Sequence, residues 1–136
     1  MIKIWVTDQF VGYHRWAECP FEEVKYLRDW HRHLFKVKVT FHVTHDDRDL
    51  EFFMVKRDLS EILRDCFEEK YLNKSCEMYA REIYENLVED YPVKYSGKIL
   101  EVEVSEDGEN GAIFIPPNTD GTVPVLSDPL GPNSKY

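Results

Sequence analysis

Three histidines are the residues of this chain whose types and spacing best suit a metal ion. His31 and His33 stand two residues apart, and His14 precedes them. Side chains two apart on a strand point to the same face, about 6.5–7 Å apart along the chain, so both imidazoles of the pair can reach one ion. A third histidine from an adjacent strand completes the ligand set of a catalytic zinc site, whose open position admits water or substrate. The alternative is that all three are ordinary surface or core residues, because short motifs often match by chance.

A carboxylate at the end of a strand-like segment is the second candidate. Apolar and polar side chains alternate over residues 99–106, and Glu106 falls on the apolar parity. A carboxylate on a core-facing parity costs free energy unless it is paired or hydrogen-bonded. A planar ligand with N–H donors would bind both of its oxygens, whereas the alternative is a strand that ends in solvent beside Asp107.

The elements that position these residues follow from the hydrophobic pattern. Alternation and apolar runs predict strands over residues 2–16, 35–44, 50–55, 99–106 and 112–115. Asp58 is predicted to open a helix, with Glu61 in capping-box position. A second helix is predicted to begin after Ser75 as its N-cap and to end before Pro92. The order β-β-β-α-α-β-β predicts an α+β fold, an antiparallel sheet with both helices on one face.

Composition narrows the class of protein. The chain has 136 residues with 26 acidic and 17 basic side chains, a formal net charge of −9. This length suits one domain, predicted over residues 1–115, followed by a proline-rich tail over residues 116–136. The acidic balance argues against a nucleic-acid groove, which draws on clustered Lys and Arg. The sequence shows no apolar run near the ~20 residues of a membrane span, and its start predicts no secretory signal. We therefore expect a cytoplasmic protein.

Five short segments, in order along the chain, form a further pattern. They are F-V-G-Y-H ending at His14, H-R-H-L-F-K-V-K-V beginning at His31, the L-N pair at Leu72 and Asn73, S-C-E-M-Y-A beginning at Ser75, and V-E-V-S-E ending at Glu106. Together they resemble the 6-pyruvoyltetrahydropterin synthase and 6-carboxytetrahydropterin synthase family. Its corresponding segments are F-x-A-x-H, C-x-x-x-H-G-H before an alternating strand, L-D-H-x-x-L-N, T-x-E-N-x-A, and a last strand closed by Glu. The resemblance spans about residues 2–115 and implies the family's tunnelling fold.

The resemblance also implies a site and an assembly. It implies zinc held by the three histidines and a pterin or purine-derived ligand bound by Glu106. Ser75 and Glu77, at the matching helix start, are implied as further ligand contacts. The family covers its sheet edges by forming rings of three subunits and stacking two rings, so the resemblance implies a homohexamer with sites between chains.

The chain departs from the family at the residues that move protons. The family's Cys, four residues before the first His of H-G-H, is Leu27 here, and the Gly of that motif is Arg32. The partner His falls on Glu69, and the Asp before it falls on Glu68. Leucine cannot transfer a proton, and the family's relay needs both thiolate and imidazole. Two replacements are conceivable: Glu69 acting as a lone acid or base, or Cys19 swinging in as a displaced thiol.

Two functions stay open at this point. The first is a zinc-dependent lyase of the 6-pyruvoyltetrahydropterin synthase type with altered acid–base residues. The second is a catalytically silent, zinc-bearing module or sensor that binds a pterin or nucleotide-derived ligand. A purely structural role is disfavoured, because the three histidines and Glu106 are all retained.

Overall fold

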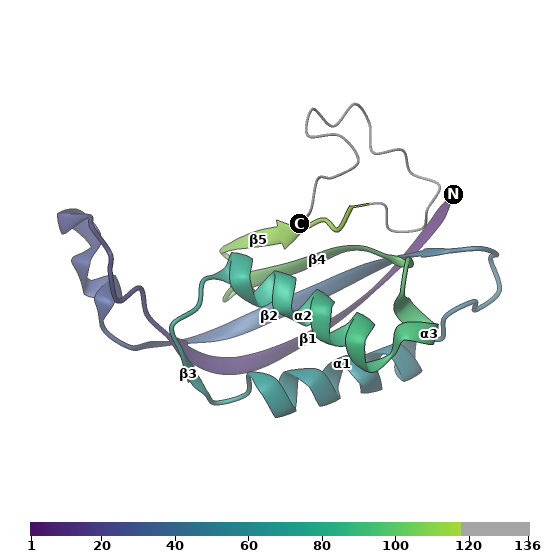
Figure 1. Ribbon diagram of the computed structural model, residues 1–136, viewed down its shortest axis with the longest axis horizontal. Coiled ribbons are helices and arrows are strands. Elements are labelled where there is room, and N and C mark those ends of the chain that lie inside the picture. Colours follow the sequence, from purple (N-terminus) through teal and green to yellow (C-terminus); the bar gives the residue numbers. More distant parts are fainter. Residues whose placement is uncertain (118–136) are drawn as a thin grey trace.

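The computed structural model describes residues 1–117, and most of the proline-rich tail predicted over 116–136 lies outside the described residues. The elements are β1 (Ile2–His14), the short 3-10 helix η1 (Glu22–Arg28), β2 (His31–Val43), α1 (Phe52–Cys66), β3 (Tyr71–Leu72), α2 (Cys76–Asp90), α3 (Pro92–Tyr95), β4 (Ile99–Glu106) and β5 (Asn110–Phe114). The helices α1 and α2 lie along one face of a single twisted sheet (Figure 1). Within residues 1–117, no helix has the length and apolar character needed to cross a membrane.

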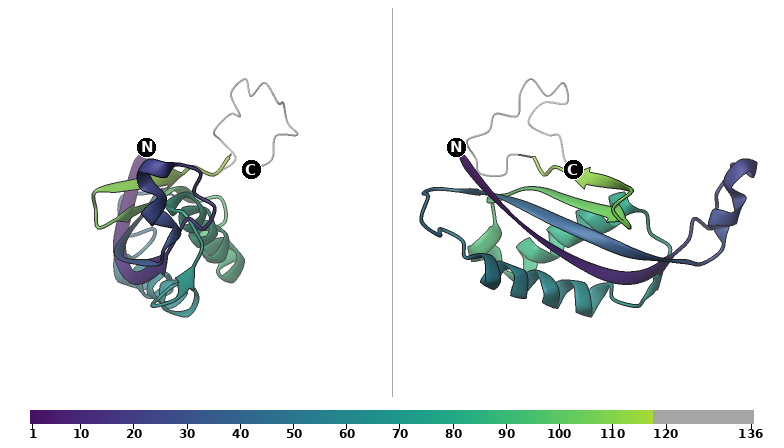
Figure 2. Two further views of the ribbon diagram at one scale, coloured as in Figure 1. Left: turned by 90° about the vertical axis from the view of Figure 1, so that its left-hand side faces the viewer. Right: turned by 180° about the vertical axis from the view of Figure 1, so that it is seen from behind.

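The sheet is built around the long pair β1 and β2. Its strand order is β3-β1-β2-β4-β5. β1 and β2 pair antiparallel over their whole length, from Ile2 opposite Val43 to His14 opposite His31. β4 continues the antiparallel pattern beside β2, and β5 beside β4, whereas the two-residue β3 runs parallel to β1. Figure 2 shows the same sheet from behind, with the helices beyond it.

The core lies between the sheet and the two long helices. One parity of each strand faces the helices, because successive side chains of a strand alternate between faces. On β1, β2 and β4 the fully buried side chains include Val6, Phe10, Phe35, Val37, Val39, Phe41, Val102 and Val104. The helices contribute Val55, Leu59, Ile62, Leu63, Tyr79, Ala80, Ile83 and Leu87. The predicted α+β class, with helices packed on one face of the sheet, is confirmed.

The predicted element order differs from the structure at several places, because one predicted strand is absent and the short elements η1, β3 and α3 were not predicted. The strand expected over residues 50–55 is largely the first turn of α1, which begins at Phe52 rather than at Asp58. Glu51 is the N-cap, because its carboxylate accepts hydrogen bonds from the backbone N–H of Phe53 and of Met54, both at 3.1 Å. The apolar run over residues 50–55 resembles a buried strand, and this is why the prediction was wrong. In the structure its aromatic residues are exposed, Phe53 by 77%.

Three other predictions of element bounds hold closely. Ser75 caps α2, and its hydroxyl accepts from the backbone N–H of Met78 at 3.2 Å. α2 ends at Asp90, and Pro92 then begins the short α3, where a residue without an N–H is tolerated. The last long strand, β4, has the predicted bounds, while β5 starts two residues earlier than expected.

Asp58, predicted as a helix start, instead anchors α3 from the middle of α1. Its side chain is buried, and Oδ2 accepts hydrogen bonds from the hydroxyl of Tyr95 at 2.5 Å and from Nζ of Lys94 at 3.0 Å. Burial, together with the hydrogen bond to Asp58, raises the pKa of Tyr95. The carboxylate is therefore a structural link between two helices.

Replacing Asp58 with Ala should destabilise the fold by about 1–3 kcal/mol, because the buried Tyr95 hydroxyl loses its acceptor. Urea unfolding followed by circular dichroism measures the change. The matched control is Asp65→Ala, in the exposed last turn of the same helix, which should change little. Equal effects of the two variants would contradict the anchoring role.

Candidate metal centre

Strand pairing alone brings the three histidines together. His14, the last residue of β1, lies directly opposite His31, the first residue of β2, while Gly12 lies opposite His33. Directly opposite residues of an antiparallel pair project from the same face of the sheet, as do residues two apart on one strand. All three imidazoles therefore project from the core-facing side of the sheet, at the end of the β1–β2 pair.

The floor beneath the histidines is aromatic. The ring of Phe35 lies 5.1 Å from that of His14 and 5.7 Å from that of His33, measured between centroids. Phe35 also stacks on Phe10 at 5.0 Å. A Cβ at Gly12 would stand 3.2 Å from ring atoms of both phenylalanines, so the absence of a side chain there makes room for this packing. The imidazoles of His14 and His33 consequently pack against an aromatic surface.

The three rings form a facial arrangement. Their centroids are 4.5 Å apart for His14 and His31, and 5.1 Å apart for each of the other two pairs. The ring planes meet at 68° to 87°. One ring nitrogen of each residue lies within 4.8 Å of the other two. The predicted histidine cluster is therefore present, and it could hold a metal ion.

Each histidine donates its Nδ1–H to an oxygen that can only accept. The acceptors are the backbone oxygen of Lys74 for His14 (2.8 Å), the backbone oxygen of Asp29 for His31 (2.8 Å), and Oδ2 of Asp107 for His33 (2.7 Å). With the proton on Nδ1, Nε2 carries a lone pair. Hydrogen bonds of this kind fix the tautomer and orientation of metal-binding histidines.

The electrostatics of His14 suit a neutral metal ligand. Burial lowers the pKa of His14, although the hydrogen bond to Lys74 works in the opposite direction. Its Nε2 is buried and has no hydrogen-bond partner among the described residues. A buried lone pair without a donor is costly, and a cation would satisfy it. The residues present therefore fit a zinc ion, which binds neutral imidazole nitrogen.

Glu106 lies at the same centre. Its Oε2 is 3.1 Å from Nε2 of His14, and its Oε1 is 3.9 Å from Nε2 of His33. Glu106 is the last residue of β4 and shares the core-facing parity of Val102 and Val104. The strand that carries it pairs with β2, which carries two of the histidines.

A cavity of about 640 Å³ opens beside the histidines. It brings together several residues singled out from the sequence: His14, His31, Leu27, Ser75, Glu77 and Glu106 all line it. Cys76 also lines it, and burial, reinforced by Glu106 and Glu77, raises the pKa of this thiol to about 12. Cys76 is therefore protonated near neutral pH and supplies no thiolate to the cavity.

The two predicted catalytic residues lie elsewhere. Cys19 is buried in the β1–β2 connection, where its thiol lies 3.7 Å from the backbone oxygens of Phe21 and Val24. Glu69 is exposed, and its backbone N–H donates to Val11 of β1 at 2.6 Å. Neither side chain is among the described residues that line the cavity. Their catalytic roles stay predictions.

Asp107 is a residue of the candidate site that the sequence analysis did not single out. One carboxylate oxygen accepts from Nδ1 of His33, and the other accepts from the backbone N–H of Leu34 at 3.0 Å. The backbone hydrogen bond from Leu34 and the side-chain hydrogen bond from His33 hold the pKa of Asp107 below its usual value. Only the β2–β4 register, which the sequence does not reveal, places this turn residue beside His33.

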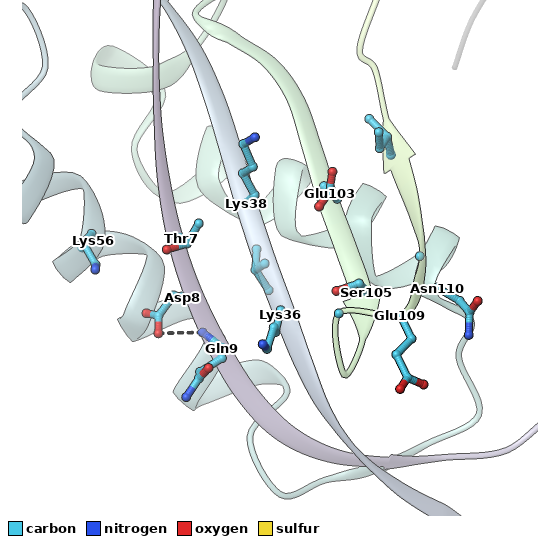
Figure 3. Close-up of a pocket in the computed structure, with 14 residues that line it drawn as sticks. Thr7, Asp8, Gln9, Lys36, Lys38, Lys56, Glu103, Ser105, Glu109 and Asn110 are labelled. Atoms are coloured by element: carbon cyan, nitrogen blue, oxygen red, sulfur yellow. Dashed lines mark hydrogen bonds between the residues drawn. The ribbon is translucent and has the colours of Figure 1, made fainter.

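A second cavity, of about 730 Å³, lies over the sheet and beside β1. Figure 3 shows its charged side chains, with Lys36 and Lys38 on β2 and Glu103 on β4. These residues have the parity that points away from the helices. The described part of the chain holds a single group of three side chains arranged for a metal, the histidine cluster, and it does not line this cavity. The histidine cavity is therefore the candidate site.

Comparison with solved structures identifies the fold. The chain is similar to the 6-pyruvoyl tetrahydropterin synthase of Caenorhabditis elegans, with a TM-score of 0.66 and 17% identity over 84% of this chain and 94% of that one. The chain has the fold of that synthase. It is also similar to an uncharacterised protein of Wolinella succinogenes, with a TM-score of 0.65 and 12% identity over 85% of this chain and 99% of that one. The sequence matches no family model and no curated protein.

The resemblance read from the five sequence segments is thereby confirmed at the level of the fold. At sequence identities of 17% and 12%, the comparison supports the fold alone.

Replacing Asp107 with Asn should weaken zinc binding about 10–100-fold, the usual effect of losing a partner of a metal-binding histidine. An amide has one acceptor oxygen, so either His33 or the Leu34 N–H loses its hydrogen bond. Competition with a chelator measures the dissociation constant. Glu109→Gln, an exposed change in the same turn, is the control, and equal affinities of the two variants would refute the positioning role of Asp107.

Proposed function

We propose that this protein holds zinc on His14, His31 and His33 and binds a pterin or purine-derived ligand in the adjoining cavity. The observation that carries the proposal is the convergence of one ring nitrogen from each of the three histidines, together with a hydrogen bond at each Nδ1 that leaves Nε2 to bind a metal. When bound, zinc polarises a ligand oxygen and acidifies a neighbouring proton.

The cavity supports a small planar ligand rich in N–H donors. Its volume of about 640 Å³ lies within the usual range for small-molecule sites, roughly 300–1,000 Å³. Glu106 and Glu77 line it as acceptors, and Ser75 lines it at the start of α2. The synthase that shares the fold is named for a tetrahydropterin, which presents such N–H groups on its ring. This likeness supports the ligand class.

The residues at the positions of the family's proton-transferring groups favour binding over catalysis. Leu27, where the family pattern has its Cys, lines the cavity and carries no transferable proton. Cys76 is held protonated, and the thiol of Cys19 points toward backbone oxygens of its own loop. Glu69 is the remaining candidate for a lyase reaction, and its side chain is exposed outside the cavity. We therefore place the silent binding module ahead of a divergent lyase.

The sheet edges support a homohexamer of two stacked trimers. β3 covers only Tyr13 and His14 on the outer side of β1, and β5 forms the opposite end of the described sheet. Unpaired strand edges must be covered, and pairing with neighbouring copies of the chain does so. Exposed apolar residues near these edges include Ile2, Trp5, Ile113 and Ile115.

All three cysteines are free thiols, which suits the reducing cytoplasm.

Protein purified from zinc-replete medium should contain about one zinc per chain, because three neutral imidazoles converge on one point. His31→Ala and His33→Ala should each remove the metal, as measured by elemental analysis. The matched control is His45→Ala, in the loop between β2 and α1, which should leave the metal content unchanged. Metal-free wild-type protein would contradict the proposal.

Zinc-loaded protein should bind a pterin, followed by the change in pterin fluorescence, and binding should be lost in His33→Ala. Incubation with dihydroneopterin triphosphate should then give binding without turnover, because Leu27 and Glu69 stand where the family pattern has its proton-transferring Cys and His. Product formation that disappears in Glu69→Gln and persists in Glu89→Gln, an exposed change on α2, would establish the lyase instead. Absence of any pterin binding would refute the ligand class.

A further inference from the structure

We propose that Glu106 is the fourth ligand of the metal in the ligand-free protein, so that the site rests closed rather than open. The inference rests on the proposed zinc site and goes beyond it, because the sequence assigned Glu106 to the organic ligand alone. The observation that carries it is the position of both carboxylate oxygens against Nε2 atoms of the histidine cluster.

The contact between Glu106 and His14 is close to the spacing of two ligands on one ion. Zinc binds nitrogen at about 2.0–2.1 Å and carboxylate oxygen at about 2.0–2.2 Å, so tetrahedral ligands stand roughly 3.3–3.4 Å apart. Oε2 of Glu106 is 3.1 Å from Nε2 of His14, and Oε1 is 3.9 Å from Nε2 of His33. The carboxylate therefore stands on the same side of the rings as the lone pairs.

The contact between Glu106 and His14 calls for a cation. Nδ1 of His14 donates its proton to the backbone oxygen of Lys74, so Nε2 presents a lone pair to the carboxylate. The same Nε2 is buried and lacks a hydrogen-bond partner among the described residues. Two electron-rich atoms in such contact repel each other, and a shared metal ion turns the repulsion into attraction.

The backbone holds Glu106 in place for this role. Glu106 pairs with Phe35 of β2 and with Asn110 of β5, so its strand is fixed on both sides. Its backbone oxygen accepts from the N–H of Glu109 at 2.9 Å, which closes the turn. Asp107, the next residue, binds Nδ1 of His33. Two consecutive carboxylates thus lie beside the imidazole of His33. Asp107 accepts a hydrogen bond from Nδ1, and Glu106 faces Nε2, the nitrogen available to a metal.

A closed site changes how a ligand enters. The oxygens of Glu106 that would accept N–H groups of a pterin are the same oxygens that face the metal position. With a metal bound, an incoming ligand that used these oxygens would draw the carboxylate away from the metal position. Metal binding and ligand binding would then be coupled through Glu106.

The test compares cobalt-substituted wild-type protein with Glu106→Gln, using the visible absorption of Co²⁺ and added azide as a probe for an open position. We expect the wild-type spectrum to be unaffected by azide, and the Glu106→Gln spectrum to change as azide binds. We also expect Glu106→Gln to weaken zinc binding at least about 10-fold in chelator competition, because even the loss of a hydrogen-bond partner of a metal ligand costs about 10–100-fold.

Two controls separate ligation from general charge effects. Glu103→Gln removes a carboxylate from the opposite parity of β4, and Glu18→Gln removes an exposed one that lines the same cavity. Both should behave as wild type. An azide response in wild-type protein, or unchanged zinc affinity in Glu106→Gln, overturns the inference while the zinc site stands. A wild-type protein that binds neither cobalt nor zinc overturns the proposed function as well.

Discussion

The register of β1 against β2 is the constraint on which the site depends. Because His14 faces His31 directly and His33 follows two residues later on the same face, the pairing positions all three imidazoles. A slip of one residue in either strand would turn its histidines to the other face of the sheet. The hydrophobic rows of the two strands enforce the register, since Val6, Phe10, Phe35 and Val37 on the same parity must all face the helices.

The candidate site thus lies on the same strand faces as the core, with polar side chains in place of apolar ones. The core-facing row of β2 runs from Val37 through Phe35 to His33 and His31, and that of β4 ends in Glu106. Where the helices no longer cover the sheet, polar groups replace apolar ones and meet across a cavity. Burial supplies the dielectric environment, and the Phe35 ring supplies the rigid support.

Much of this could be predicted from residue patterns. Alternation located β2 and β4, and the capping preference of Ser75 located α2, because both signals are local. The start of α1 was missed because an exposed run of aromatic residues looks like a strand and because Glu51, a less common cap, begins the helix. The histidine cluster was found from spacing. Asp107 was not found, because its contact with His33 spans 74 positions and depends on strand register.

The three Nδ1 hydrogen bonds reach well beyond the cluster itself. The hydrogen bond of His14 reaches Lys74, the residue before the N-cap of α2. That of His33 reaches Asp107 in the β4–β5 turn. That of His31 reaches Asp29 in the β1–β2 connection. An ion on these rings would hold parts of the chain that are distant in sequence. Since whatever binds only the folded state stabilises it, the heat tolerance of the whole domain would rise and fall with the zinc supply of its surroundings.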